Sequence, residues 1–157
     1  MHRIVTVLVA MSCLTLNAVA IQTGAARPAP GACSLLTKEV LAAHTPESTP
    51  SFTLMIQVPA QEEKIGTGSS CQYGGVMLQV DPFPVANFER LFGKYTSVTG
   101  VGERAYFHDN AGRWAELALL AGGRMVTIQM SVPTGKSAAS IQPNTVALAN
   151  AVLAKLK

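Results

Sequence analysis

Three strand-like segments separated by glycine-containing turns constrain the fold of this chain most strongly. They span residues 104–108, 113–120 and 124–132, and the turns between them are Asp109-Asn110-Ala111-Gly112 and Gly122-Gly123. Glycine and asparagine accept the positive φ values of tight hairpins, so the three segments are expected to form an antiparallel meander. Apolar and polar residues alternate along the third segment, which is typical of a half-buried strand. Its predicted outward-facing residues are Met125, Thr127, Gln129 and Ser131.

Shorter patterns predict further strands upstream. Residues 69–73 and 76–80 flank Gly74-Gly75, which suits a tight hairpin, and residues 51–58 alternate strictly between apolar and polar side chains. The polar, glycine-containing residues 61–70 are predicted to form a loop, which overlaps the start of the 69–73 strand.

Helix signals occur at three places. Thr37 is a good N-cap for a short helix that Pro46 ends, and Pro84 suits the first turn of a helix running to about Tyr95. A final helix is predicted to begin at Pro143, with its apolar face formed by Val146, Ala149, Val152, Leu153 and Leu156.

These elements together predict an α+β fold. The sheet is expected to be antiparallel with about five or six strands, the helices are expected on one face, and one disulfide is expected. A chain of 157 residues is long enough for one real core and too short for two domains with separate cores. Residues 33–157 are therefore predicted to form a single domain.

The N-terminal segment has the pattern of a secretory signal peptide. Arg3 precedes an apolar run, and Ala18-Val19-Ala20 places small residues where a signal peptidase reads them. Residues 1–20 are therefore predicted to be a signal peptide and residues 21–32 a flexible linker rich in proline and glycine. Two alternatives stay open, namely a retained membrane anchor and a lipid attached to Cys13.

Export decides how the cysteines are interpreted. If Cys13 leaves with the signal peptide, Cys33 and Cys71 are the only cysteines in the exported chain. An oxidising compartment favours a disulfide between them. The alternative is a catalytic or metal-binding thiol, although the pair has no CxxC spacing and the exported chain retains only His44 and His108 as histidines.

The charge balance argues against two classes of partner, nucleic acids and membrane surfaces. Twelve Lys and Arg against nine Asp and Glu give a formal net charge of +3, which is too weak for a nucleic-acid or membrane-surface partner. Neither a cofactor nor a metal site is predicted, because the histidines and cysteines lack ligand spacing. After removal of residues 1–20 no stable membrane insertion is expected.

One group of strand residues is a candidate binding patch. If Ala115, Leu117 and Leu119 face the core, then Trp114 and Glu116 lie on the opposite face of their strand, because side chains alternate along a strand. The neighbouring strand then brings Arg104 and Tyr106 to the same side. Aromatic and charged side chains gathered in this way can hold a ligand or a partner.

Short motifs resemble those of a group of small exported bacterial domains of unknown function. The group includes envelope lipoproteins and is similar to extracellular sensor domains of bacterial serine/threonine kinases. The resemblance lies in residues 33–37 (Cys-Ser-Leu-Leu-Thr), 71–73 (Cys-Gln-Tyr) and 101–106 (Val-Gly-Glu-Arg-Ala-Tyr). It implies an envelope domain with a Cys33–Cys71 bridge and a binding or sensing role, and it supplies no catalytic residue.

Two function classes follow from the sequence. The first is a non-catalytic module, periplasmic or secreted, that binds an envelope ligand or protein. The second is a small secreted hydrolase whose site is assembled from scattered residues. No motif in the chain combines a nucleophile, a base and an orienting group, so the binding module is favoured.

Overall fold

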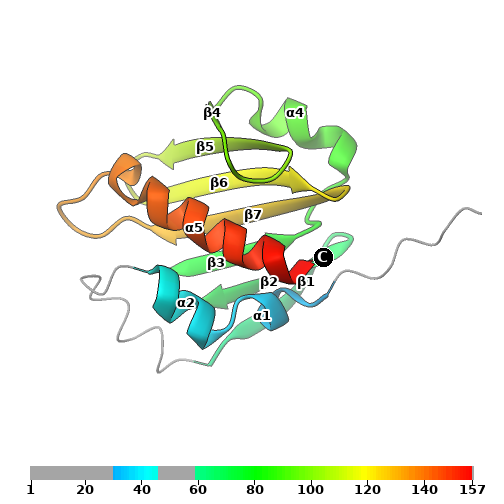
Figure 1. Ribbon diagram of the computed structural model, residues 1–157, viewed down its shortest axis with the longest axis horizontal. Helices are drawn as coiled ribbons and strands as arrows, with labels where there is room; N and C mark the ends of the chain where they lie inside the picture. Colours follow the sequence, from blue (N-terminus) through cyan, green and yellow to red (C-terminus); the bar gives the residue numbers. More distant parts are fainter. Residues whose placement is uncertain (1–29, 46–58, 157) are drawn as a thin grey trace, which may run out of the picture.

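The computed structural model describes residues 30–45 and 59–156 and is built on one antiparallel sheet (Figure 1). Its seven strands lie in the order β1-β2-β3-β7-β6-β5-β4. The strands are β1 (Gln61–Ile65), β2 (Gly68–Tyr73), β3 (Val76–Val80), β4 (Thr96–Val98), β5 (Arg104–Asn110), β6 (Trp114–Ala121) and β7 (Arg124–Ser131).

The sheet joins two meanders. The first runs β1-β2-β3 and the second runs β4-β5-β6-β7, and β3 pairs with β7 where they meet. After β3 the chain must therefore cross the sheet to reach β4 at the far edge. Residues 81–95 make that crossing, and they contain the 3-10 turn η1 (Val85–Asn87) and the short helix α4 (Phe88–Phe92).

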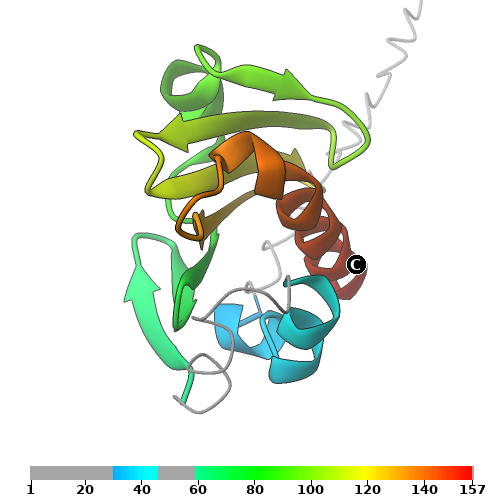
Figure 2. The same ribbon diagram turned by 90° about the vertical axis from the view of Figure 1, so that its left-hand side faces the viewer.

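Helices cover both faces of the sheet. One face carries α1 (Ala32–Leu35), α2 (Lys38–His44) and the long α5 (Ala138–Leu156), and α4 lies on the other face (Figure 2). We call these the inner and the outer face. The prediction that the helices lie on one face is thus wrong for residues 84–95, because the crossing between β3 and β4 runs over the outer face.

The main core lies between the inner face and its helices. Its fully buried members include Leu78, Leu117 and Ile128 from the sheet and Leu148 from α5. A smaller apolar cluster lies under α4, where Phe88 and Phe92 cover Ala118, Leu120 and Met125 on the outer face. Met125 is for this reason buried, although it lies on the predicted outward side of β7, and Thr127 on the same side is also buried.

The disulfide between Cys33 and Cys71 is present, with the two Cα atoms 4.9 Å apart. It links α1 to β2, and two hydrogen bonds act beside it. The Ala32 amide donates to Ser69 Oγ at 2.8 Å, and the Cys33 amide donates to Glu62 Oε1 at 3.3 Å. Ala32 is fully buried in α1, so the predicted linker ends before this residue.

The predicted antiparallel sheet with helices and one disulfide is confirmed, but the predicted count of five or six strands is too low. Residues 61–65 form β1 in place of the predicted loop, and β4 had no prediction. The last helix begins at Ala138, because the Ser137 hydroxyl accepts the Ser140 amide and caps it, and Pro143 lies inside the helix.

Some predictions fall on parts of the chain that the structure does not describe. The signal peptide 1–20, most of the linker 21–32 and the strand 51–58 lie outside the described residues. None of the helices in the described part has the length and apolar character that crossing a membrane demands.

Candidate functional site

The crossing segment leaves a groove on the outer face. Residues 88–92 cover the outer face over the end of β6 and the start of β7, and the opposite end of this face carries no helix in the described structure (Figure 2). A cavity of about 410 Å³ lies where the covered and uncovered parts meet. We call it the outer groove, and its lining residues are Gln79, Phe83, Leu91, Phe92, Lys94, Tyr95, Glu116, Thr127 and Gln129.

The floor of the outer groove is polar and comes from three adjacent strands. Gln79 on β3 lies directly opposite Thr127 on β7, and Gln129 on β7 lies directly opposite Glu116 on β6. Residues 127 and 129 point to the same side because side chains alternate along a strand. The strand register therefore places two amides, a hydroxyl and a carboxylate next to one another.

Thr127 is the unusual member of this floor. The residue is only 3% exposed, and its hydroxyl has no hydrogen-bond partner among the described residues. Leaving a buried polar group unsatisfied costs about 1–3 kcal/mol. A valine would fill the same space without that cost.

The neighbouring amides are held to different degrees. Gln129 Nε2 donates to Glu116 Oε2 at 2.6 Å, a charge-assisted hydrogen bond that fixes both side chains. Gln79 Nε2 donates to Met77 Sδ at 3.9 Å, which is weak because a thioether is a poor acceptor. The Gln79 amide can therefore turn at little cost.

The wall of the outer groove is aromatic and is anchored on β5. The ring of Tyr95 stacks on His108 with centroids 3.9 Å apart, and the ring of Phe92 lies 6.4 Å from that of Tyr95. Phe83 is 49% exposed at the rim. Lys94 Nζ lies 5.1 Å from the centre of the Tyr95 ring, within the range of a cation–π contact.

A separate set of polar contacts fixes α4 to the sheet. Arg104 Nη1 bonds Glu89 Oε1 at 2.6 Å, and the Tyr106 hydroxyl donates to Glu89 Oε2 at 3.0 Å. The bond to Glu89 raises the pKa of Tyr106, because the phenolate would face a carboxylate. These contacts hold the wall of the outer groove in place.

The four residues of the predicted binding patch all belong to the outer face but do not gather at one point. Arg104 and Tyr106 contact Glu89, whereas half-buried Trp114 lies opposite Asn110 and Ser131 at the other end of β6. Trp114 lies six positions along β6 from Leu120, the residue opposite Arg104, which is a distance of about 20 Å. Only Glu116 among them lines the outer groove, and the binding role of the patch stays a prediction.

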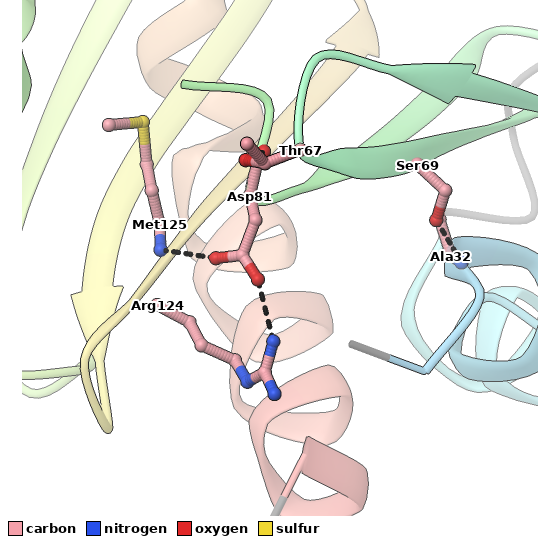
Figure 3. Close-up of polar contacts among 6 residues, drawn as sticks. All are labelled: Ala32, Thr67, Ser69, Asp81, Arg124 and Met125. Carbon is pink, nitrogen blue, oxygen red and sulfur yellow. Dashed lines mark hydrogen bonds and ion pairs between the residues drawn. The ribbon is translucent and has the colours of Figure 1, made fainter. Parts of the chain in front are cut away.

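A second polar cluster lies where the two meanders join (Figure 3). Asp81 follows β3, and its carboxylate bonds Arg124 Nη1 at 2.6 Å and accepts the Met125 amide at 3.2 Å. Its carbonyl accepts the Thr67 hydroxyl at 2.8 Å. These bonds connect the β1–β2 turn, the end of β3 and the start of β7, so we assign the cluster to structure.

Metal chemistry receives no support from the described side chains. Within residues 30–45 and 59–156, no three His, Cys, Asp or Glu side chains are grouped so that they could hold a metal ion. His108 is stacked on Tyr95, and Cys33 and Cys71 are joined, which overturns the alternative of a reactive thiol at either position.

Comparison with protein-family models, with curated proteins and with solved structures finds no match for this chain. The resemblance to small exported bacterial domains therefore stays a prediction that rests on the short motifs.

Sequence reasoning identified Glu116 as a candidate and missed the rest of the outer groove. Thr127 and Gln129 belong to the outward side of the alternation predicted along residues 124–132, which is the signal that could have found them, and Gln79 lies directly opposite Thr127. What the sequence does not reveal is that residues 83–95 fold back over this face and build the wall.

Proposed function

We propose that the protein is an exported module of the bacterial envelope, periplasmic or secreted, that binds a ligand or a protein partner without converting it. We place the binding site in the outer groove. The apolar N-terminal segment and the disulfide support export, since disulfides persist in oxidising compartments.

The observation that carries this proposal is the Thr127 hydroxyl in the polar floor of the outer groove, which has no hydrogen-bond partner in the described part of the chain. The other three side chains of this floor, Gln79, Gln129 and Glu116, each take part in at least one hydrogen bond, strong or weak. A ligand that bonds Thr127 would remove the cost of leaving it unsatisfied. Stability given up at a binding site is a common trade in proteins.

Replacing Thr127 tests whether this hydroxyl serves binding. Thr127→Val keeps the β-branched shape and removes the unsatisfied group, so we expect the free energy of unfolding to rise by about 1 kcal/mol. Ligand binding should fall in the same variant. The matched control is Thr45→Val, because the Thr45 hydroxyl is also buried with no partner among residues 30–45 and 59–156 and lies outside the outer groove.

The binding assay uses the isotope-labelled, oxidised protein and follows the side-chain amide signals of Gln79 and Gln129 by NMR. Representatives of three envelope chemistries are titrated, namely neutral oligosaccharides, short peptides and phospholipid vesicles. At least one class should shift these signals in wild type and in Thr45→Val, with a weaker effect in Thr127→Val. If the Gln79 and Gln129 signals shift with none of the three classes, the outer groove is not a binding site for them, which would count against the proposal. Chemical conversion of any of these compounds by the protein would count against a non-catalytic module.

A further inference from the structure

We propose that the outer groove accepts an uncharged carbohydrate of one or two rings. This inference rests on the proposed function, which makes the outer groove a binding site, and adds the chemistry of the ligand. It follows from the floor, the wall, the charge and the size of the cavity.

The floor matches hydroxyl groups. Each glutamine amide offers two N–H donors and a carbonyl acceptor, and a threonine hydroxyl both donates and accepts. Gln79, Gln129 and Thr127 therefore present donors and acceptors side by side, with the acceptor Glu116 next to them. A sugar hydroxyl also donates and accepts, so a ring that carries several of them can satisfy such a mixed set.

The wall matches the other side of a sugar ring. Phe83, Phe92 and Tyr95 line the cavity, and the Tyr95 ring is held rigid by its stack on His108. Rigid aromatic side chains give contact area at low cost in conformational entropy. The C–H face of a sugar ring can pack on them while its hydroxyl edge faces the amides.

Charge in the lining favours an uncharged ligand. The outer groove contains one carboxylate, Glu116, and one ammonium group, Lys94, so the lining has no net charge. With one charge of each sign, the lining has no excess charge that would attract an anionic or a cationic ligand.

The floor also disfavours the two other ligand classes. The backbones of β3, β7 and β6 are hydrogen-bonded to one another under the outer groove. An extended peptide therefore cannot pair with them there as an added strand. An acyl chain would cover the polar floor and offer no hydrogen bond to the Thr127 hydroxyl or to the weakly held Gln79 amide, which costs free energy.

The size of the cavity limits the ligand to a small one. A volume of about 410 Å³ lies near the lower end of the range for small-molecule sites. The Thr127 hydroxyl oxygen is buried, so a ligand reaches it only if a neighbouring side chain moves, and the weakly held Gln79 amide lies directly opposite Thr127. Side-chain rearrangements of this kind are common on binding.

The experiment titrates oxidised, isotope-labelled protein with cellobiose, maltose and N,N′-diacetylchitobiose, monitored by NMR of the glutamine side-chain amides. At least one disaccharide should shift the Gln79 and Gln129 signals in a saturable way. Thr127→Val and Gln79→Leu should each weaken that affinity tenfold or more, a loss of about 1.4 kcal/mol. Thr45→Val and Gln72→Leu should leave it unchanged, since Thr45 and Gln72 do not line the outer groove. Thermal melts of every variant show that it is folded.

The outcomes separate this inference from the proposed function. The carbohydrate inference is overturned if no disaccharide shifts the Gln79 and Gln129 signals. It is also overturned if Thr127→Val and Gln79→Leu both leave the disaccharide affinity unchanged. If a short peptide or a phospholipid vesicle then shifts the same signals, the outer groove is still a binding site. If no class shifts them, the proposed function fails as well.

Discussion

Asp81 combines an unfavourable backbone conformation with several polar contacts. Its φ of 51° lies in the left-handed region, which Asp and Asn tolerate better than most other residues. Its amide donates to the Met125 carbonyl at 2.7 Å, and its carboxylate returns to the Met125 amide and to Arg124. The turn after β3 is thus fixed by the side chain of the residue that makes it.

Substitutions at Asp81 separate these contributions. Asp81→Ala removes the ion pair and places alanine at a positive φ, so we expect the free energy of unfolding to fall by about 2–3 kcal/mol. Asp81→Asn keeps a residue suited to this conformation and an oxygen for the Met125 amide, so the loss should be about 1 kcal/mol. Chemical denaturation of wild type, Asp81→Ala and Asp81→Asn measures the free energy of unfolding of each protein and ranks the three. Equal losses in both variants would show that the backbone conformation contributes little.

At the scale of elements, the disulfide joins α1 to the sheet. Cys71 is fully buried in β2, and the bridge closes a loop with a sequence separation of 38 residues. Because that loop includes α2 and β1, the bridge restricts a large part of the unfolded chain. The hydrogen bonds from Ala32 and Cys33 hold the same contact in the folded state.

Removal of the disulfide should therefore lower the free energy of unfolding by about 2–5 kcal/mol. The variant of choice is Cys33→Ala/Cys71→Ala, because it leaves no free thiol and buries no new hydroxyl. Urea denaturation of this variant is compared with that of the oxidised and the reduced wild type. The reduced wild type should resemble the double variant, and a loss well under 2 kcal/mol in both would contradict the expected role.

A pH-dependent contact fixes α4. The hydrogen bond to Glu89 raises the pKa of Tyr106 above its ordinary value of 10.0. Because the folded-state pKa is the higher one, the stability from this contact is present below the ordinary value. It is lost as the pH rises through the folded-state value.

Glu89→Gln should therefore lower the pKa of Tyr106 toward its ordinary value. It should also reduce the amount of unfolding free energy that is lost when the pH rises through that pKa. An NMR titration of the tyrosine ring signals measures the pKa. Glu63→Gln is the matched control, because Glu63 is exposed on the edge strand β1, which is not adjacent to β5. A Tyr106 pKa that stays raised in Glu89→Gln would show that Glu89 is not the cause.

The elements that the sequence predicted well are those with strong local signals. Gly74-Gly75 and Gly122-Gly123 mark two hairpins, and β3 has the predicted bounds. By contrast β1 reads Gln-Glu-Glu-Lys-Ile, a polar sequence that looks like a loop and is in fact an edge strand exposed to water. Charged residues on an edge strand discourage pairing with other chains, which is why the pattern misleads.

The outer groove could not be predicted, because it depends on contacts between distant segments. The sequence predicts a helix from Pro84 to about Tyr95, but a helix signal does not say which face of the sheet the helix covers. The path from β3 to β4 decides that, and β4 is a three-residue strand with little local signal.

At the scale of the whole molecule, the two faces of the one sheet differ in how they are covered. The inner face is covered by α1, α2 and α5 and contains most of the apolar core, including the residues next to the disulfide. The outer face is only partly covered by residues 83–95, and it bears the polar groups of the outer groove. The main core and the proposed binding site therefore share the same strands on opposite faces, so we expect substitutions in the outer groove to change binding while the main core stays intact.

The last prediction concerns the form in which the whole chain operates. If residues 1–20 are a signal peptide, a bacterial host that exports the full chain should release a protein that begins at Ile21, because Ala18 and Ala20 match the residues that a signal peptidase reads. Intact-mass analysis under non-reducing conditions should also show two hydrogens fewer than the reduced chain, the mark of the Cys33–Cys71 bridge. Ala20→Leu is the control variant and should block cleavage at this site. A mass that retains residues 1–20, or one that carries a lipid on Cys13, would mean that the protein stays attached to the membrane, and the proposed binding module would then act at its surface.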